Sequence, residues 1–65
     1  MNISKEAMVD TLHKKNLVST TDNMEEWTKR QIAERMDVRI SATNYVSQTA
    51  FHEACDQRKE KGDKL

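Results

Sequence analysis

The residues best suited to catalysis in this chain are two histidines and one cysteine, and their arrangement argues against an enzyme. His52 and Cys55 could place two zinc ligands on one helix, but a structural zinc site needs about four and no others cluster nearby. Neither His13 nor His52 belongs to a pattern that identifies a nucleophile with its base. Gly62 is the only glycine, which excludes a glycine-rich phosphate loop. We therefore expect no catalytic site, metal or cofactor.

A second set of polar residues has the chemistry to contact nucleic acid. If Ala42, Tyr45 and Val46 face inward from a helix, the side chains that face outward are Thr43, Asn44, Ser47 and Gln48. Asparagine and glutamine suit adenine edges in the major groove, and hydroxyl groups adapt to several bases. The cations placed to hold phosphates are Lys29, Arg30 and Arg39. An ordinary solvated helix face is the alternative, because no lysine or arginine lies between Arg39 and Arg58.

A short amphipathic helix that begins after Thr28 would position these residues. Thr28 and Gln31 have the spacing of a capping box, in which each side chain accepts a hydrogen bond from the other residue's backbone N–H. Trp27 and Ile32 occupy the two positions of a hydrophobic staple at the same helix start. Asp37 follows the apolar pattern, so we expect the helix to end there in a turn.

Residues 28–46 resemble the helix-turn-helix unit of DNA-binding domains, with a capped short helix, a small residue at Ala33, a turn at Asp37 and a second helix. The unit is similar to that of the compact regulators that phages and other mobile elements encode. The resemblance implies a transcription regulator or recombination accessory factor that binds double-stranded DNA. The family usually has glycine where this chain has Asp37, and aspartate can adopt that left-handed conformation at a cost.

The second helix of this pair has two possible registers. In one, it starts near Arg39 and turns Thr43 toward the core. In the other, Ser41 is the N-cap and Tyr45 packs inward. We favour the second register, because Ser41 is the better N-cap and threonine is a poor core residue. A wing-like hairpin has no strong strand signal here, although residues 38–40 could form a short extended piece.

Length and composition predict one small all-α domain of three to four helices, containing this helix-turn-helix-like pair, over residues 1–56. The chain has 65 residues, one glycine and no proline, and it is rich in helix formers. Its single cysteine excludes an internal disulfide, and no apolar run approaches a membrane span, so we expect a cytoplasmic protein. Residues 57–65 carry mixed charges and predict a frayed C-terminal tail.

Local chemistry predicts three further elements. The first helix covers residues 1–16, with Ser4 as its N-cap and Asn16 as a left-handed terminator. The cluster Ser-Thr-Thr-Asp-Asn at residues 19–23 predicts a linker. A separate helical turn would follow the linker, with Trp27 as a core anchor.

An apolar patch on the last predicted helix indicates a homodimer. The patch consists of Phe51, Ala54 and Cys55, which point away from the inward face of the same helix and would be exposed on a small monomer. The formal net charge is zero, which counts against a strong non-specific nucleic-acid binder. The alternative function is a helical interaction module that inhibits or adapts a host or partner protein, for which flexible methionine side chains are suited.

Overall fold

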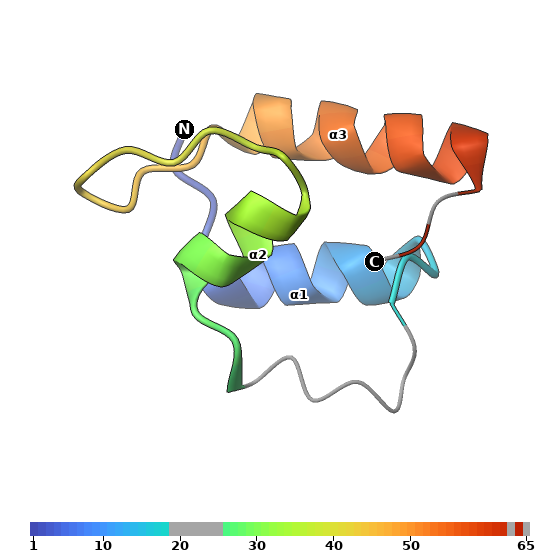
Figure 1. Ribbon diagram of the computed structural model, residues 1–65, viewed down its shortest axis with the longest axis horizontal. Helices are drawn as coiled ribbons and strands as arrows, with labels where there is room; N and C mark the ends of the chain where they lie inside the picture. Colours follow the sequence, from blue (N-terminus) through green and yellow to red (C-terminus); the bar gives the residue numbers. More distant parts are fainter. Residues whose placement is uncertain (19–25, 63, 65) are drawn as a thin grey trace.

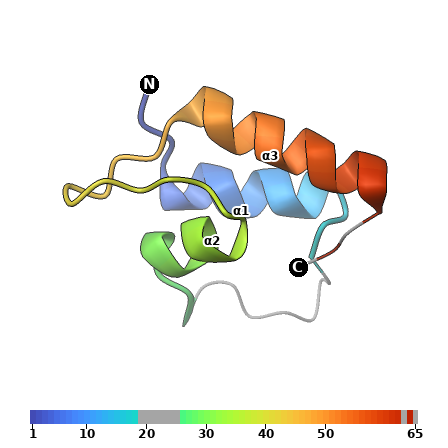
Figure 2. The ribbon, with the colours of Figure 1, turned by 45° about the horizontal axis from the view of Figure 1, so that its top comes forward.

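The computed structural model describes residues 1–18, 26–62 and 64, and these residues form three helices (Figure 1). The helices are α1 (Lys5–Lys14), α2 (Lys29–Arg35) and α3 (Gln48–Lys61). α1 and α3 run side by side in the same direction, and the short α2 packs beside them (Figures 1 and 2). The prediction of a small all-α domain is confirmed. The linker predicted at 19–23 lies outside the described residues.

None of the three helices combines the length and the apolar character that crossing a membrane requires.

Local side-chain chemistry fixes both ends of α1 where the sequence predicts them. The Ser4 hydroxyl accepts a hydrogen bond from the Ala7 backbone N–H at 3.2 Å, which makes Ser4 the N-cap. Asn16 adopts a left-handed conformation (φ 56°), and the Leu17 N–H donates to the Leu12 carbonyl at 2.9 Å. This Schellman-type stop satisfies carbonyl groups that the end of the helix would otherwise leave unpaired.

α2 begins and ends with two further motifs that the sequence predicts. The Thr28 N–H donates to Gln31 Oε1 at 2.8 Å, and the Gln31 N–H donates to Thr28 Oγ1 at 3.1 Å, so the capping box is complete. Asp37 adopts the left-handed conformation (φ 57°), and the Val38 N–H donates to the Ala33 carbonyl at 2.9 Å. The helix therefore ends in the turn predicted around Asp37.

The prediction of a helix that begins at Ser41 is wrong, because the next helix after α2 is α3, which begins at Gln48. Its N-cap is Ser47, whose hydroxyl accepts from the Ala50 N–H at 3.4 Å. Residues 38–47 form a loop whose two arms lie side by side and project from the helices (Figures 1 and 2). Short polar side chains in this stretch bond to the nearby backbone, and such bonds favour a turn over a helix. Within residues 28–46 the structure therefore holds one helix and not two.

The N-terminal residues pair with the far end of this loop. The Ile3 N–H donates to the Val46 carbonyl at 3.0 Å, and Asn2 lies opposite Ser47 in an antiparallel bridge. The segment predicted for the first helix, residues 1–16, thus contributes a short extended piece before Ser4. No local pattern could indicate this pairing, because 44 residues separate Asn2 from Val46.

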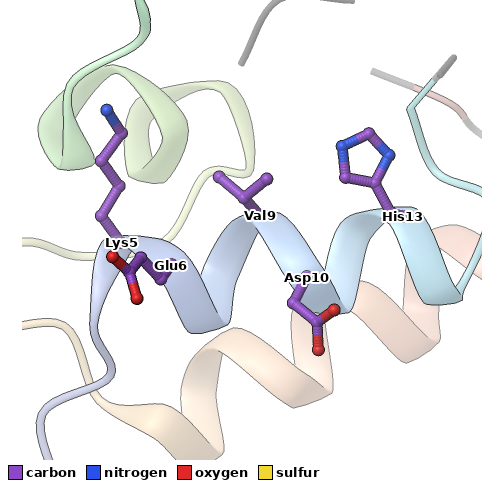
Figure 3. Close-up of a pocket in the computed structure, with 5 residues that line it drawn as sticks. All are labelled: Lys5, Glu6, Val9, Asp10 and His13. Atoms are coloured by element: carbon purple, nitrogen blue, oxygen red, sulfur yellow. The ribbon is translucent and has the colours of Figure 1, made fainter. Parts of the chain in front are cut away.

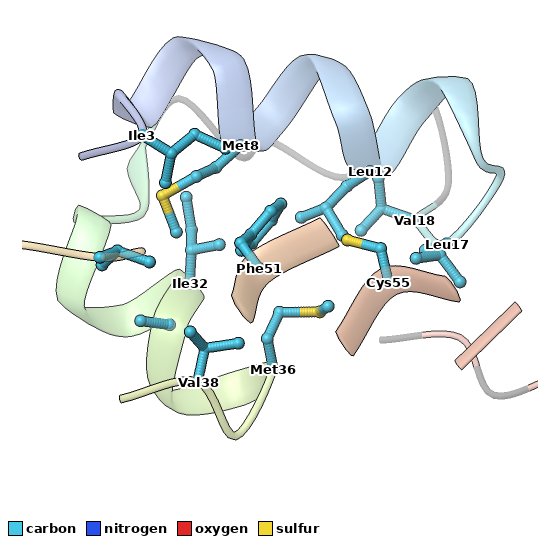
Figure 4. Packing of buried hydrophobic residues seen from close by; sticks show 12 residues of the cluster. Ile3, Met8, Leu12, Leu17, Val18, Ile32, Met36, Val38, Phe51 and Cys55 are labelled. Atoms are coloured by element: carbon cyan, nitrogen blue, oxygen red, sulfur yellow. The ribbon is translucent and has the colours of Figure 1, made fainter. Parts of the chain in front are cut away.

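One hydrophobic core joins these segments, with Phe51 of α3 fully buried in the middle (Figure 4). All three helices, the N-terminal segment and both ends of the loop contribute to it. The buried side chains among the described residues are Ile3, Met8, Leu12, Leu17, Val18, Ile32, Ala33, Met36, Val38, Val46, Phe51 and Cys55. Trp27, predicted as a core anchor, is half-buried against this cluster, and the Arg35 guanidinium lies 4.3 Å from the centre of its ring.

The predicted dimer interface is wrong for Phe51 and Cys55, because both side chains lie inside the core of a single chain. Ala54 is half-buried and packs against the same core. The prediction depended on a helix with two apolar faces that included residues 41–47. Because α3 starts at Gln48, its buried side chains form a single face, and the sequence-based reason for a homodimer no longer holds.

α3 also extends into the predicted tail. It continues through residues 57–61 and ends at Gly62, which takes a left-handed φ of 74°. Its last turn carries the basic residues Arg58, Lys59 and Lys61, which suit the negative end of the helix dipole. Most of the stretch that the sequence assigned to a frayed tail is therefore regular helix.

Replacing Phe51 with alanine should remove a third or more of the protein's stability and lower its melting temperature markedly. A buried Phe-to-Ala change costs about 3–5 kcal/mol, and a domain of this size has a total stability of roughly 3–10 kcal/mol. Tyr45 provides the matched control, because this residue is 45% exposed and the loss of its ring should cost no more than about 1 kcal/mol. Thermal unfolding followed by circular dichroism measures both variants. Equal melting temperatures for F51A and Y45A would contradict the assigned core.

Candidate nucleic-acid interface

The most exposed continuous stretch among the described residues is the tip of the loop, residues 41–45. Thr43 and Asn44 lie at this tip, and Arg39 is exposed on the arm that leads to it. Ser47 and Gln48 lie at the opposite end of the loop, where both are half-buried at the start of α3. The four residues predicted to contact bases therefore do not share one helix face. The structure brings Thr43 and Asn44 together at the tip and places Ser47 and Gln48 at the base.

Hydrogen bonds within the loop hold its tip in one conformation. The Ser41 N–H donates to the Tyr45 carbonyl at 3.1 Å, and the Asn44 N–H donates to the Ser41 carbonyl at 3.0 Å. The Ser41 hydroxyl accepts from the Tyr45 N–H at 3.0 Å and lies 2.9 Å from Thr43 Oγ1. Asn44 takes a left-handed φ of 61°, a conformation that asparagine tolerates better than most residues. The backbone of the tip is therefore fixed by hydrogen bonds within the loop itself.

Two apolar anchors and one side-chain contact fix the base of the loop. Val38 and Val46 are buried at its two ends, so the residues between them project from the core. Asn2 Oδ1 accepts the Val46 N–H at 3.0 Å, which adds to the backbone bond from Ile3. Asn2 Oδ1 also accepts from Lys29 Nζ at 2.6 Å. Sequence reasoning missed Asn2, because its two partners lie 27 and 44 residues away.

The cations predicted to hold phosphates differ in their exposure and in the hydrogen bonds that they already make. Arg30 and Arg39 are exposed, whereas Lys29 is half-buried and its ammonium is bonded to Asn2. The start of α2, which carries Arg30, lies at the same end of the molecule as the loop (Figures 1 and 2). No aspartate or glutamate occurs in residues 38–52, although acidic residues are frequent elsewhere in the chain. The loop therefore carries a positive charge without a compensating carboxylate of its own.

Several other cations contribute to the fold. Arg58 Nη2 donates to the Arg35 carbonyl at 2.8 Å and lies 3.6 Å from an Asp37 carboxylate oxygen, which links the end of α2 to α3. Lys15 Nζ donates to the Asp56 carboxylate at 2.6 Å, linking α1 to α3. This contact lowers the pKa of Asp56 and raises the pKa of Lys15 from their ordinary values. These charges are already paired and are poor candidates for phosphate binding.

A hollow of about 460 Å³ is lined by residues of α1, and it offers no arrangement typical of catalysis (Figure 3). Its lining residues are Lys5, Glu6, Val9, Asp10 and His13. The carboxylates of Glu6 and Asp10 point to one side of the helix, whereas His13 points to the other (Figure 3). Asp10 also pairs with Lys14 at 3.0 Å. Across the described residues no group of three His, Cys, Asp or Glu side chains is placed to hold a metal ion.

The pair His52 and Cys55 is equally unsuited to nucleophilic catalysis. Burial raises the pKa of the Cys55 thiol from an ordinary value of 9.0 to about 11, so the reactive thiolate is scarce. His52 is half-buried and meets the Phe51 ring edge to face, with 6.3 Å between the ring centres. Cys55 lies in the hydrophobic core, and His52 packs against the ring of Phe51.

No protein-family model matches this chain, and comparison with curated proteins and with solved structures gave no match either.

Cys55 should react with a thiol reagent at least about a hundredfold more slowly in the folded chain than in denaturant at pH 8. A pKa two units higher leaves about one hundredth of the thiolate, and burial further restricts access. Because the thiol pKa is raised on folding, its contribution to stability is complete below pH 9.0 and is lost as the pH rises toward about 11. Stopped-flow thiol titration and unfolding at several pH values measure these effects. Equal reaction rates in the folded and unfolded chains would show that Cys55 is accessible.

Proposed function

We propose that this chain binds double-stranded DNA through the loop at residues 38–47, assisted by the start of α2. The observation that carries the proposal is an exposed tip whose conformation is fixed by its own hydrogen bonds, in a stretch (residues 38–52) that contains no aspartate or glutamate. A preformed contact surface loses little conformational entropy on binding, so even a small surface can contribute affinity. The role of a regulator or recombination accessory factor was implied by the helix-turn-helix resemblance, and residues 28–46 hold only one helix, so we limit the proposal to DNA binding.

The side chains at the tip suit the edges of bases. The Asn44 amide makes no hydrogen bond to any described residue, so its donor and acceptor are both available to adenine. Thr43 adds a hydroxyl and a methyl group, which suit several bases and the thymine methyl. A two-armed ribbon has the width that the major groove admits, so this loop can take the place of a recognition helix. Ser47 is occupied as the N-cap of α3 and is not part of the proposed contact.

Arg30 and Arg39 would supply the phosphate contacts. Each cation that neutralises a phosphate contributes a slope of about −0.9 to the dependence of log affinity on log salt concentration. Two such contacts predict a slope near −2 and weak binding to random sequence, in the range of about 10⁻⁴ to 10⁻⁶ M. This weak binding agrees with a formal net charge of zero.

The alternative of a methionine-rich interaction surface has lost its main support. Met8 and Met36 are buried in the core, and the apolar side of α3 packs within the same chain. The large hydrophobic residues that remain exposed among the described ones are Met1 and Tyr45. We therefore do not propose this function.

Fluorescence anisotropy with labelled duplexes, repeated at several salt concentrations, tests DNA binding. We expect R39A to weaken binding to all sequences about equally and to make the salt slope shallower by about one unit, because one phosphate contact is lost. N44A should reduce the preference among sequences by about 1–3 kcal/mol while leaving the salt slope unchanged. The charge-matched control is K61A, which removes a cation at the far end of α3 and should change neither quantity.

Two results would overturn the proposal. One is the absence of binding to any duplex at low salt. The other is binding that is indifferent to salt and to both loop variants, which would indicate an apolar contact unrelated to a phosphate backbone.

A further inference from the structure

The side chain of Asn2 joins three segments that lie far apart in the sequence. Its Oδ1 accepts the Val46 backbone N–H at 3.0 Å and Lys29 Nζ at 2.6 Å. Val46 is the buried residue that directly follows the exposed tip of the loop, and Lys29 is the first residue of α2. One oxygen of the N-terminal segment is therefore bonded to both parts of the proposed DNA-binding surface.

The other polar contacts near this point do not connect all three segments. The Ile3 N–H donates to the Val46 carbonyl at 3.0 Å and holds the N-terminal segment against the loop. The N–H of Gln48, the first residue of α3, donates to the Met1 carbonyl at 2.8 Å and holds the same segment against α3. Neither of these bonds reaches α2. The Lys29 ammonium supplies that connection, and it sits next in sequence to the exposed Arg30. Loss of the Asn2 side chain would therefore leave the loop paired with the N-terminal segment, but only apolar packing in the shared core would then connect the end of the loop to α2.

We propose that Asn2 is a positioning residue that sets the loop tip and Arg30 at a fixed separation, so that both contact one DNA duplex at the same time. The inference rests on the proposed function. Two contacts held in a fixed geometry reinforce each other, because the second forms without a further loss of freedom once the first has formed. Two contacts that move independently lose this advantage, although each side chain remains present.

A double-mutant cycle tests the coupling. We expect R30A to weaken DNA binding about three- to tenfold when Asn2 is present, but less than about twofold in a chain that also carries N2A. Replacement N2D should preserve the full effect of R30A, because a carboxylate oxygen can accept from both Val46 and Lys29. K61A serves as the control cation and should have the same small effect in either background. A role limited to overall stability would leave the R30A effect equal in the two backgrounds, and that result would overturn the proposal.

Amide hydrogen exchange without DNA provides a second measurement. N2A should speed exchange about tenfold at Val46 and also at Ile32, whose N–H closes the first turn of α2, whereas N2D should not. The Leu17 amide, at the other end of α1, serves as the control and should be unchanged. If Val46 and Ile32 exchange at unaltered rates in N2A, Asn2 does not hold the two segments together. If exchange in N2A is faster but the protein binds no duplex, the proposed function is wrong. In that case Asn2 still connects the loop to α2.

Discussion

The burial of one small set of apolar side chains around Phe51 is the constraint on which the rest of this structure depends. The chain has few large hydrophobic residues, so each segment must supply one or more of them to the same core. Ile3 and Val46 belong to segments without helix, and their burial determines where these segments run. The loop projects for the same reason. Val38 and Val46 are buried at its two ends, whereas residues 41–45 between them are exposed.

Four residues in the left-handed backbone conformation allow the chain to turn sharply between its segments. Asn16 and Asp37 follow the ends of α1 and α2, and Gly62 follows the end of α3. Asn44 lies within the tip of the loop. At each of these positions the chain must change direction, and the left-handed conformation also lets backbone N–H groups reach carbonyls that would otherwise be unpaired. Asparagine and aspartate take this conformation at lower cost than most residues, which allows a chain with a single glycine to turn several times.

The distribution of charge separates side chains that hold the fold from those available for binding. Lys15 and Arg58 connect α3 to the other helices, and Arg35 lies over the ring of Trp27. Arg30 and Arg39 remain exposed. No carboxylate follows Arg39 before Glu53, whereas Glu34 and Asp37 lie between the two arginines in the sequence. The formal net charge of zero describes the whole chain, whereas the loop at residues 38–47 itself carries one positive charge, that of Arg39. What a phosphate backbone meets is the local arrangement of charges within about a Debye length, which is roughly 10 Å.

The sequence by itself determined the helical class, the starts of α1 and α2, and the turns that end these two helices. Ser4, Thr28 with Gln31, and Asp37 act through bonds to residues three to five positions away, so their patterns can be read locally. Only the tertiary structure decided the course of residues 38–47, the partner of Asn2 and the burial of Phe51 and Cys55. These features depend on contacts between segments distant in the sequence. Ser41 accepts a backbone N–H in this turn much as it would at a helix start, so the local pattern of residues 41–46 does not distinguish the two conformations. The burial of Val38 and Val46 decides between them.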